Sequence, residues 1–231
     1  LNTGTRDLSH RFILETLVQH GAPESILYDA KPHIGTDYLH RVLLSLRREL
    51  LERGCDIRFG HRLAGIEVKG GHVAALQMES KDGPYLLPAN AAVLALGNSA
   101  RDTFEMLYAA GVPMEPKPLA VGVRIEHRQA DIDLAQYKAL AGHPRLPASS
   151  YKLSCHLDNG RGVFSFCVCP GGTVVAAASE EKRVVTNGMS RYARNGENCN
   201  GGLLVGVTPV DFPGSGPLAG IAFQRALEEA A

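Results

Sequence analysis

The sequence predicts an α+β fold in which mixed and antiparallel sheets are flanked by helices. Two patterns indicate it. Apolar residues recur at helical spacing over residues 36–53 and again over 217–231. Between these segments, short apolar runs alternate with glycine, proline and asparagine turns, which is typical of strands joined into hairpins. The chain is 45% hydrophobic and 21% charged, which favours an ordinary globular domain over a disordered segment.

The clearest helix is predicted over residues 36–53. Thr36 is expected to cap its start, and Gly54 is expected to end it. Its apolar stripe comprises Leu39, Val42, Leu43, Leu46 and Leu50. Three further helices are expected, over residues 6–20, 131–141 and 217–231.

Strand patterns fill most of the remaining chain. Lys69-Gly70-Gly71-His72 separates two of them and is typical of a hairpin turn. The polar stretch 179–201 is expected to be a long functional loop, because loops of that length in compact domains usually carry function. Strands are expected at residues 56–59, 63–68, 73–78, 85–87, 91–96, 119–125, 151–157, 162–168, 173–177 and 202–208.

A proline-rich connection at residues 113–118 is the expected boundary within the chain. It separates residues 1–112, which combine helices with a sheet, from the strand-rich residues 113–231, and the two parts are expected to pack as one unit. The chain begins with Leu1 and ends inside a helical pattern, so it is expected to be a piece of a longer protein.

The composition excludes several classes of partner. Lysine plus arginine and aspartate plus glutamate number 24 each, so no broad charge favours nucleic acid or an anionic membrane. No apolar run approaches the ~20 residues of a membrane span. The five cysteines form no Cys-x-x-Cys pairs, so no metal site is assigned and a reducing, cytoplasmic setting is expected.

Residues 91–102 predict a strand, a glycine and a helix start in direct succession. The apolar run 91–96 is expected to be a strand buried on both faces and to end at Gly97. Ser99 and Asp102 have the spacing of a capping box. Such a corner directs backbone N–H groups and a positive helix end at one point, where an anion can bind. An ordinary strand-to-helix connection is the alternative.

Cysteines and arginines suggest two further sites. Cys155, Cys167 and Cys169 could form a thiol or metal cluster or simply be small buried thiols, and Cys167 and Cys169 are expected to share one face of a strand. Cys199, within the polar stretch, is the thiol expected to be exposed. The arginines that could clamp an anion, or else belong to a solvated loop, are Arg183, Arg191 and Arg194.

Four long stretches of the chain carry a family resemblance: 22–37 (APESILYDAKPHIGTD), 96–104 (LGNSARDTF), 166–172 (FCVCPGG) and 185–198 (VTNGMSRYARNGEN). They resemble the uncharacterised FAD-dependent dehydrogenases, flavoproteins of the glutathione-reductase-like superfamily. This resemblance implies the C-terminal, substrate-side portion of a two-dinucleotide-domain-type flavoprotein. Residues 1–112 would then adjoin an FAD-binding Rossmann core, and 113–231 would form a substrate or interface subdomain.

The resemblance also implies which residues bind the cofactor. Arg62 and Leu63 would meet the adenine end of FAD. The strand ending at residue 97 would close the pocket, although Leu96 stands where the family has a threonine hydroxyl. The closing residues would be Ala95, Leu96, Gly97, Asn98 and Ser99. Those facing the flavin ring or the substrate would be Lys31, Pro32, Gly35, Thr36, Thr186, Asn187, Gly188, Met189, Ser190 and Arg194. His33, Asp37 and Cys169 are the candidate catalytic groups.

The activity implied for the parent protein is oxidation or reduction of a small molecule by hydride transfer through FAD, with NAD(P)H as a candidate electron donor. The partner of this chain would be the N-terminal, FAD-binding portion of the same protein, which carries the Gly-x-Gly-x-x-Gly motif. Without that portion, the piece is expected to bind FAD poorly and to be inactive. An alternative is a non-redox anion- or nucleotide-binding module, formed by residues 97–101 with the arginines at 183–194.

Overall fold

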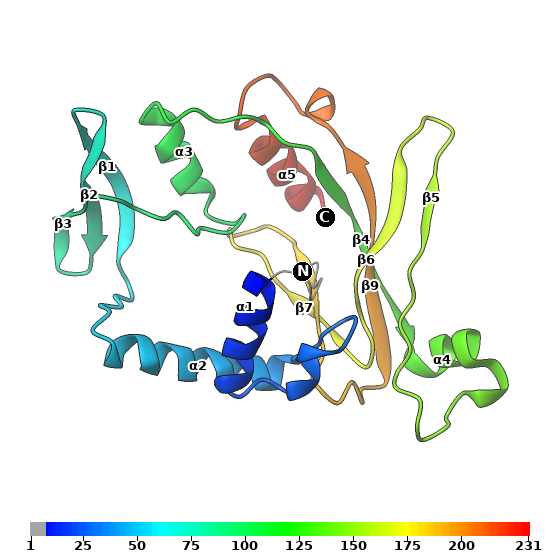
Figure 1. The fold of residues 1–231 in the computed structure, drawn as a ribbon. Coiled ribbons are helices and arrows are strands. Elements are labelled where there is room, and N and C mark those ends of the chain that lie inside the picture. The colour runs from blue at the N-terminus through cyan, green and yellow to red at the C-terminus, as the bar shows by residue number, and fades with distance from the viewer. Residues whose placement is uncertain (1–7) are drawn as a thin grey trace. The chain divides into compact units, whose positions relative to one another are not determined.

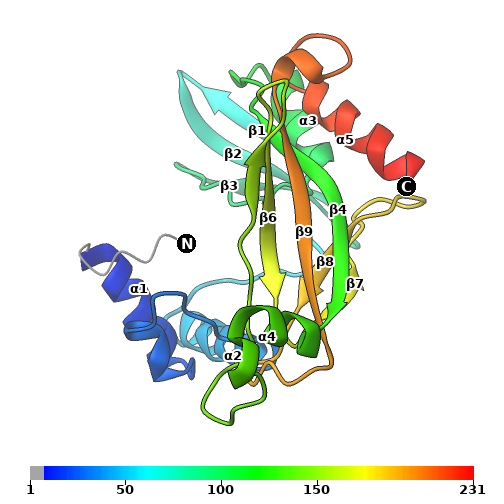
Figure 2. The ribbon, with the colours of Figure 1, turned by 90° about the vertical axis from the view of Figure 1, so that its right-hand side faces the viewer.

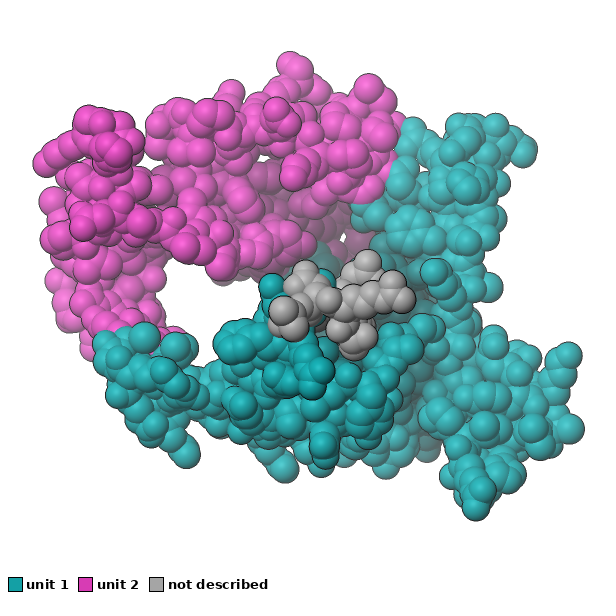
Figure 3. Space-filling model, in the orientation of Figure 1, with its two compact units in different colours: residues 1–55, 120–178, 185–206 teal, residues 56–119, 179–184, 207–231 magenta. Residues whose placement is uncertain are grey.

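The computed structural model describes residues 8–231 of the chain (Figure 1). These form two compact units (Figure 3). Unit 1 comprises residues up to 55, together with 120–178 and 185–206, and unit 2 comprises 56–119, 179–184 and 207–231. Helices and antiparallel sheets are both present, so the α+β prediction is confirmed. The boundary expected at residues 112 and 113 stays a prediction.

The first part of unit 1 is helical. Helices α1 (Leu8–Gln19) and α2 (Thr36–Glu52) follow the predicted helices closely, and a 3-10 turn that was not predicted, η1 (Glu24–Leu27), lies between them. Their shared core consists of Leu14, Ala22, Ile26 and Val42. His20 at the end of α1 also contacts Ser45 and Glu49 of α2, each at 2.8 Å. Among residues 8–231, no helix is long and apolar enough to cross a membrane.

Two details of the α2 prediction are wrong. Of its predicted apolar stripe only Val42 is fully buried, and the three leucines at 39, 43 and 50 are exposed, because α1 and η1 cover one side of the helix alone. Thr36 does not cap the helix: Gly35 occupies that position, and the Thr36 N–H donates to the carbonyl of Ser190 instead.

A four-stranded sheet forms the second part of unit 1. Its order is β4 (Leu119–Arg128), β9 (Asn198–Val207), β6 (Gly162–Cys169) and β5 (Ser154–His156), and Figure 2 shows β4, β9 and β6 side by side. β6 is antiparallel to both β5 and β9. After β4 come helix α4 (Gln129–Tyr137) and the turn η2 (Lys138–Leu140), near the helix predicted at 131–141.

The polar stretch 179–201 is not one continuous loop. It contains strand β8 (Thr186–Met189), which pairs with β7 (Thr173–Ala176), and it runs into the start of β9. The sequence Thr-Asn-Gly-Met has no apolar alternation, which is why β8 was not predicted. Cys199 lies within β9 and is buried, so the expectation of an exposed thiol there is wrong.

Unit 2 is built on a three-stranded antiparallel sheet. Strands β1 (Arg62–Lys69), β2 (His72–Ser80) and β3 (Gly83–Pro88) pair in chain order. The predicted hairpin turn is confirmed at Gly70 and Gly71, both with positive φ. Helix α3 (Arg101–Ala109), the turn η3 (Pro209–Asp211) and helix α5 (Ala219–Ala230) complete the regular structure of this unit.

Two predicted strands do not form, at residues 56–59 and 91–96. The second was expected to be buried on both faces, yet Val93 is 93% exposed. A strand requires a neighbour for its N–H and C=O groups, and within residues 8–231 no backbone hydrogen bond joins 91–98 to another segment. Residues 91–96 are therefore an extended apolar stretch whose backbone is left unpaired.

The predicted capping box at the start of α3 is also wrong. The helix begins at Arg101, with Ala100 in the capping position and no side-chain cap. The hydroxyl of Ser99 donates to the side chain of Asn98 at 3.4 Å. Ser99 lies one residue too early to reach the first free amides of the helix.

Candidate functional site

In unit 1, the loop at residues 31–37 is joined to residues 190–192. The Thr36 N–H donates to the Ser190 carbonyl at 3.1 Å, and the Tyr192 N–H donates to Asp37 Oδ1 at 2.9 Å. His33 Nε2 donates to the carbonyl of Arg191 at 3.0 Å, since a carbonyl can only accept. Two segments assigned to the flavin or the substrate from sequence therefore lie side by side in this unit.

Gly35 makes this junction possible. Its φ is +83°, and a Cβ atom at this position would lie 2.2 Å from the backbone nitrogen of Tyr192. Next to it, the rings of Tyr38 and Tyr192 are 5.1 Å apart in a tilted arrangement. The junction therefore requires glycine at position 35.

Asp37 is held in its ionised form. The hydrogen bond from the Tyr192 backbone N–H keeps the pKa of the Asp37 carboxyl below its usual value. A carboxylate that accepts this bond is suited to positioning residues 190–192. It is a poor proton donor at neutral pH, which argues against a role for Asp37 as general acid.

Beneath β8, the guanidinium of Arg124 bridges several strands. Its Nη1 donates to Asn200 Oδ1 at 2.7 Å and to the Cys167 carbonyl at 3.3 Å, and its Nη2 reaches Asn187 Oδ1 at 3.5 Å. A Cβ at Gly188 would lie 2.3 Å from Asn200 Oδ1 and 2.6 Å from Arg124 Nη1. Gly188 is thus the residue that allows β8 to pack directly over this pair.

Cys169 is a poor candidate for a nucleophile. It is buried, and burial raises the pKa of its thiol, so the reactive thiolate is disfavoured. Burial likewise raises the pKa of the Cys199 thiol to about 11. Both thiols therefore act as small buried groups.

Within the proposed cluster of Cys155, Cys167 and Cys169, the side chains of Cys167 and Cys169 interact, and this contact adds to the rise in the pKa of the Cys169 thiol. A register shift between Phe166 and Cys169, with Cys167 at φ +48°, turns Cys167 to the surface while Cys169 stays buried. The two thiols therefore differ in exposure, although their side chains interact. In the described part of the chain, no three His, Cys, Asp or Glu side chains are grouped to hold a metal ion.

In unit 2, the residues assigned to the adenine side of FAD lie at the start of β1 and just before α3. Arg62 pairs with Glu79 at 2.6 Å and with Asp102 of α3 at 3.4 Å, so its charge is already partnered. Gly97 has φ +66° and open space where a Cβ would be. Residue 96 is partly buried, and the other residues of 95–99 are exposed.

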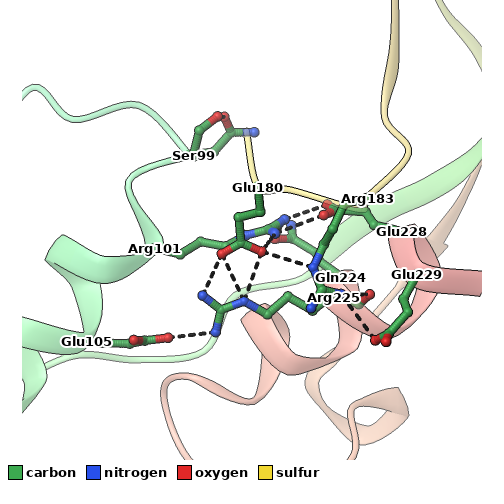
Figure 4. Close-up of polar contacts among 10 residues, drawn as sticks. Ser99, Arg101, Glu105, Glu180, Arg183, Gln224, Arg225, Glu228 and Glu229 are labelled. Carbon is green, nitrogen blue, oxygen red and sulfur yellow. Dashed lines mark hydrogen bonds and ion pairs between the residues drawn. The ribbon is translucent and has the colours of Figure 1, made fainter. Parts of the chain in front are cut away.

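The sequence suggested that Arg183 and Arg101 could each bind an anion. Both predictions are wrong, because both side chains are paired with glutamates. Arg101 is 8% exposed and pairs with Glu228 at 2.5 Å and with Glu180 at 3.0 Å (Figure 4). Arg183 pairs with Glu180 and Glu229. Both guanidinium groups are thus neutralised by glutamates, which leaves them unsuited to a second anion.

Sequence reasoning missed Arg124 and Asn200. Arg124 sits within the otherwise apolar run Leu119–Ile125, and an isolated cation in such a strand was the available indication. Its partners lie 43 to 76 residues away in the chain, so their identity could not be read from local spacing.

Comparison with known proteins agrees with the family resemblance in its broad outline. Residues 118–231 match the family described as FAD-dependent protein, C-terminal domain-like. An uncharacterized protein of Clostridium beijerinckii is 45% identical over 232 residues, which cover 100% of this chain and 43% of that protein. The chain thus spans less than half the length of that relative. The C-terminal half of this chain, from β4 to α5, is similar to the C-terminal domain of FAD-dependent proteins.

Proposed function

We propose that this chain is the substrate-side part of a cytoplasmic FAD-dependent oxidoreductase. The observation that carries the proposal is the junction in unit 1, where the Thr36 N–H bonds to the Ser190 carbonyl. It places residues 31–37 beside the end of β8, and the family resemblance assigns both segments to the flavin or substrate side. The match of residues 118–231 to a domain of FAD-dependent proteins supports this assignment.

In this proposal, residues of unit 2 hold one edge of a nucleotide cofactor. Residues 91–98 leave their backbone N–H groups without hydrogen bonds in the described chain, and Gly97 leaves space for a ligand to approach the backbone. In this proposal Arg62, Leu63 and residues 95–99 hold the adenine side of FAD. When bound, FAD supplies the hydride chemistry, with NAD(P)H as the proposed electron donor.

In unit 1, the proposal gives residues 31–37 and 186–194 the task of facing the flavin ring or a small-molecule substrate. Asp37 holds the backbone of Tyr192, and His33 holds the carbonyl of Arg191, so both fix the position of this surface. The pyrophosphate-binding glycine motif is contributed, in this proposal, by an N-terminal portion of a longer chain. The relative, 57% of whose length lies outside the match, is consistent with such a portion.

The test is to purify the natural protein with its N-terminal extension, in parallel with the 231-residue chain. The extended protein is expected to be yellow, with flavin absorbance that NADH or NADPH bleaches under anaerobic conditions. The 231-residue chain is expected to retain no stoichiometric FAD on gel filtration. A folded but colourless extended protein would contradict the proposal.

A non-redox anion-binding module is the second candidate function. One observation favours it: among residues 8–231, Arg124 bonds to neutral oxygen acceptors and lies beside the Cys169 thiol, and it forms no ion pair with a carboxylate. This candidate predicts a colourless extended protein that still binds small anions, so the absorbance measurement separates the two functions.

A further inference from the structure

We propose that Arg124 and Asn187 form a binding site for the carboxylate of a small organic acid. The site lies at the exposed edge of β8, within unit 1. Assigning this acid as the substrate rests on the proposed function, whereas the binding site itself rests on the geometry of Arg124. The proposal therefore narrows the substrate to the class of carboxylic acids.

The charge of Arg124 has no counterion among the described residues. Three other arginines of unit 1 are paired with carboxylates, namely Arg11 with Glu15, Arg53 with Glu49 and Arg128 with Asp131. Arg124, by contrast, donates to two side-chain amides and one backbone carbonyl. A partly buried guanidinium with only neutral partners is stabilised when an anion binds next to it.

The two terminal nitrogens of the Arg124 guanidinium group, Nη1 and Nη2, differ in their hydrogen bonds. Nη1 is anchored inside the fold by Asn200 Oδ1 at 2.7 Å and by the Cys167 carbonyl. Nη2 makes only a bond of 3.5 Å, to the exposed side chain of Asn187. That length is at the limit of a hydrogen bond, so Nη2 remains free to donate to a better acceptor. The group is thus held in place on one side and available on the other.

Asn200 supplies an independent observation. Its side chain is 0% exposed, and Arg124 Nη1 fixes the orientation of its amide because a guanidinium requires the oxygen. This leaves Nδ2 buried, with no hydrogen-bond partner in the described structure. A buried donor without an acceptor points to a ligand or water that completes the site.

A carboxylate suits this site better than a phosphate does. The donors are one guanidinium edge and neutral amides, which match a planar, singly charged group. A phosphate dianion is usually bound by several cations or by a helix N-terminus. The described contacts of Arg124 include neither.

The binding test uses acetate as the probe and the 231-residue chain as the protein. Amide NMR signals of Asn187 and Gly188 are followed during titration with acetate, with inorganic phosphate and with chloride at equal ionic strength. Acetate is expected to give saturable shifts at both residues, with phosphate binding more weakly. Shifts that acetate and chloride produce alike, or tighter binding of phosphate, would overturn the proposal.

A variant that introduces a negative charge next to Arg124 tests the role of Arg124 without removing it. Asn187→Asp keeps an oxygen facing Nη2 and adds a charge that pairs with Arg124, so acetate affinity is expected to fall about tenfold or more. The control is Asn159→Asp, an exposed residue whose Oδ1 accepts the Arg161 N–H at 3.1 Å, and it is expected to bind acetate like the wild type. Wild-type affinity in Asn187→Asp would contradict the proposal.

This test and that of the proposed function can fail separately. Acetate binding needs no flavin. A colourless extended protein with acetate bound at Arg124 would therefore contradict the oxidoreductase function and support the carboxylate site. A yellow extended protein that binds no acetate at Arg124 would contradict the carboxylate site and support the oxidoreductase function.

Discussion

Gly35 and Gly188 each lie where one backbone packs against a distant segment. Gly35 allows the 31–37 loop to reach Tyr192, and Gly188 allows β8 to reach Arg124 and Asn200. At both positions a Cβ would lie 2.2 to 2.3 Å from its nearest neighbour, closer than real Cβ atoms approach. Single glycines thus determine which parts of the candidate site in unit 1 come together.

Replacing Gly35 tests this dependence. Gly35→Ala is expected to lower the free energy of unfolding by about 2–3 kcal/mol, since it adds a clash with Tyr192 to an unfavourable positive φ. Gly54→Ala is the matched control, because Gly54 has the same φ of +83° with open space around it. The control is expected to cost only about 1 kcal/mol. Equal losses in urea denaturation would show that the contact with Tyr192 is unimportant.

At the scale of elements, ion pairs connect α3 and α5 to residues 179–184 within unit 2. Glu180 accepts from Arg225 at 2.6 Å and from Arg101 at 3.0 Å, and Arg225 also pairs with Glu105 of α3 (Figure 4). The hydrogen bond from Arg225 lowers the pKa of the Glu180 carboxyl to about 2, from an ordinary value of 4.5. This segment was expected to bind a ligand, and instead it supports the fold.

This network predicts a pH dependence for the stability of unit 2. A carboxyl whose pKa is lower in the folded state stabilises the fold above its unfolded pKa, near 4.5, and loses this contribution as the pH falls toward 2. Wild-type stability is therefore expected to fall through that window. Glu180→Gln, which cannot titrate, is expected to show a shallower fall in urea unfolding at pH 6, 4 and 3. An unchanged slope in the variant would mean that other carboxyls dominate.

The same scale shows which elements a sequence can predict. The helix at 36–53 and the hairpin at Gly70 and Gly71 were correct because their patterning is local. Residues 91–96 have the composition of a buried strand but no partner in this chain, and strand formation depends on a partner. β8 was missed for the opposite reason, since its polar sequence forms a strand through pairing with β7.

For the candidate site, the sequence indicated which segments belong to it but not which side chains bond to one another. The resemblance grouped 31–37 with 186–190, and the structure joins Thr36 to Ser190. The difference in exposure between Cys167 and Cys169 could not be foreseen, because the register shift there interrupts the alternating pattern. The Arg124 cluster unites residues from β4, β6, β8 and β9, a convergence that only the sheet order reveals.

At the scale of the whole molecule, apolar surfaces remain without partners in the described chain. Residues 91–96 are extended and largely exposed, and α2 exposes leucines at positions 39, 43 and 50. The relative that matches the entire chain is more than twice as long, with 43% of it covered. These observations support the proposal that a further portion of a longer protein packs against this chain.

The central claim, that the 31–37 and 186–194 surface faces the flavin or its substrate, is tested most directly by hydrogen exchange. Amide exchange of the natural protein with its N-terminal extension would be compared with and without bound FAD. The account predicts slower exchange on FAD binding at residues 31–37 and 186–194 in unit 1, and at residues 95–99 in unit 2. Protection confined to the N-terminal extension, with unchanged exchange at all three segments, would contradict it.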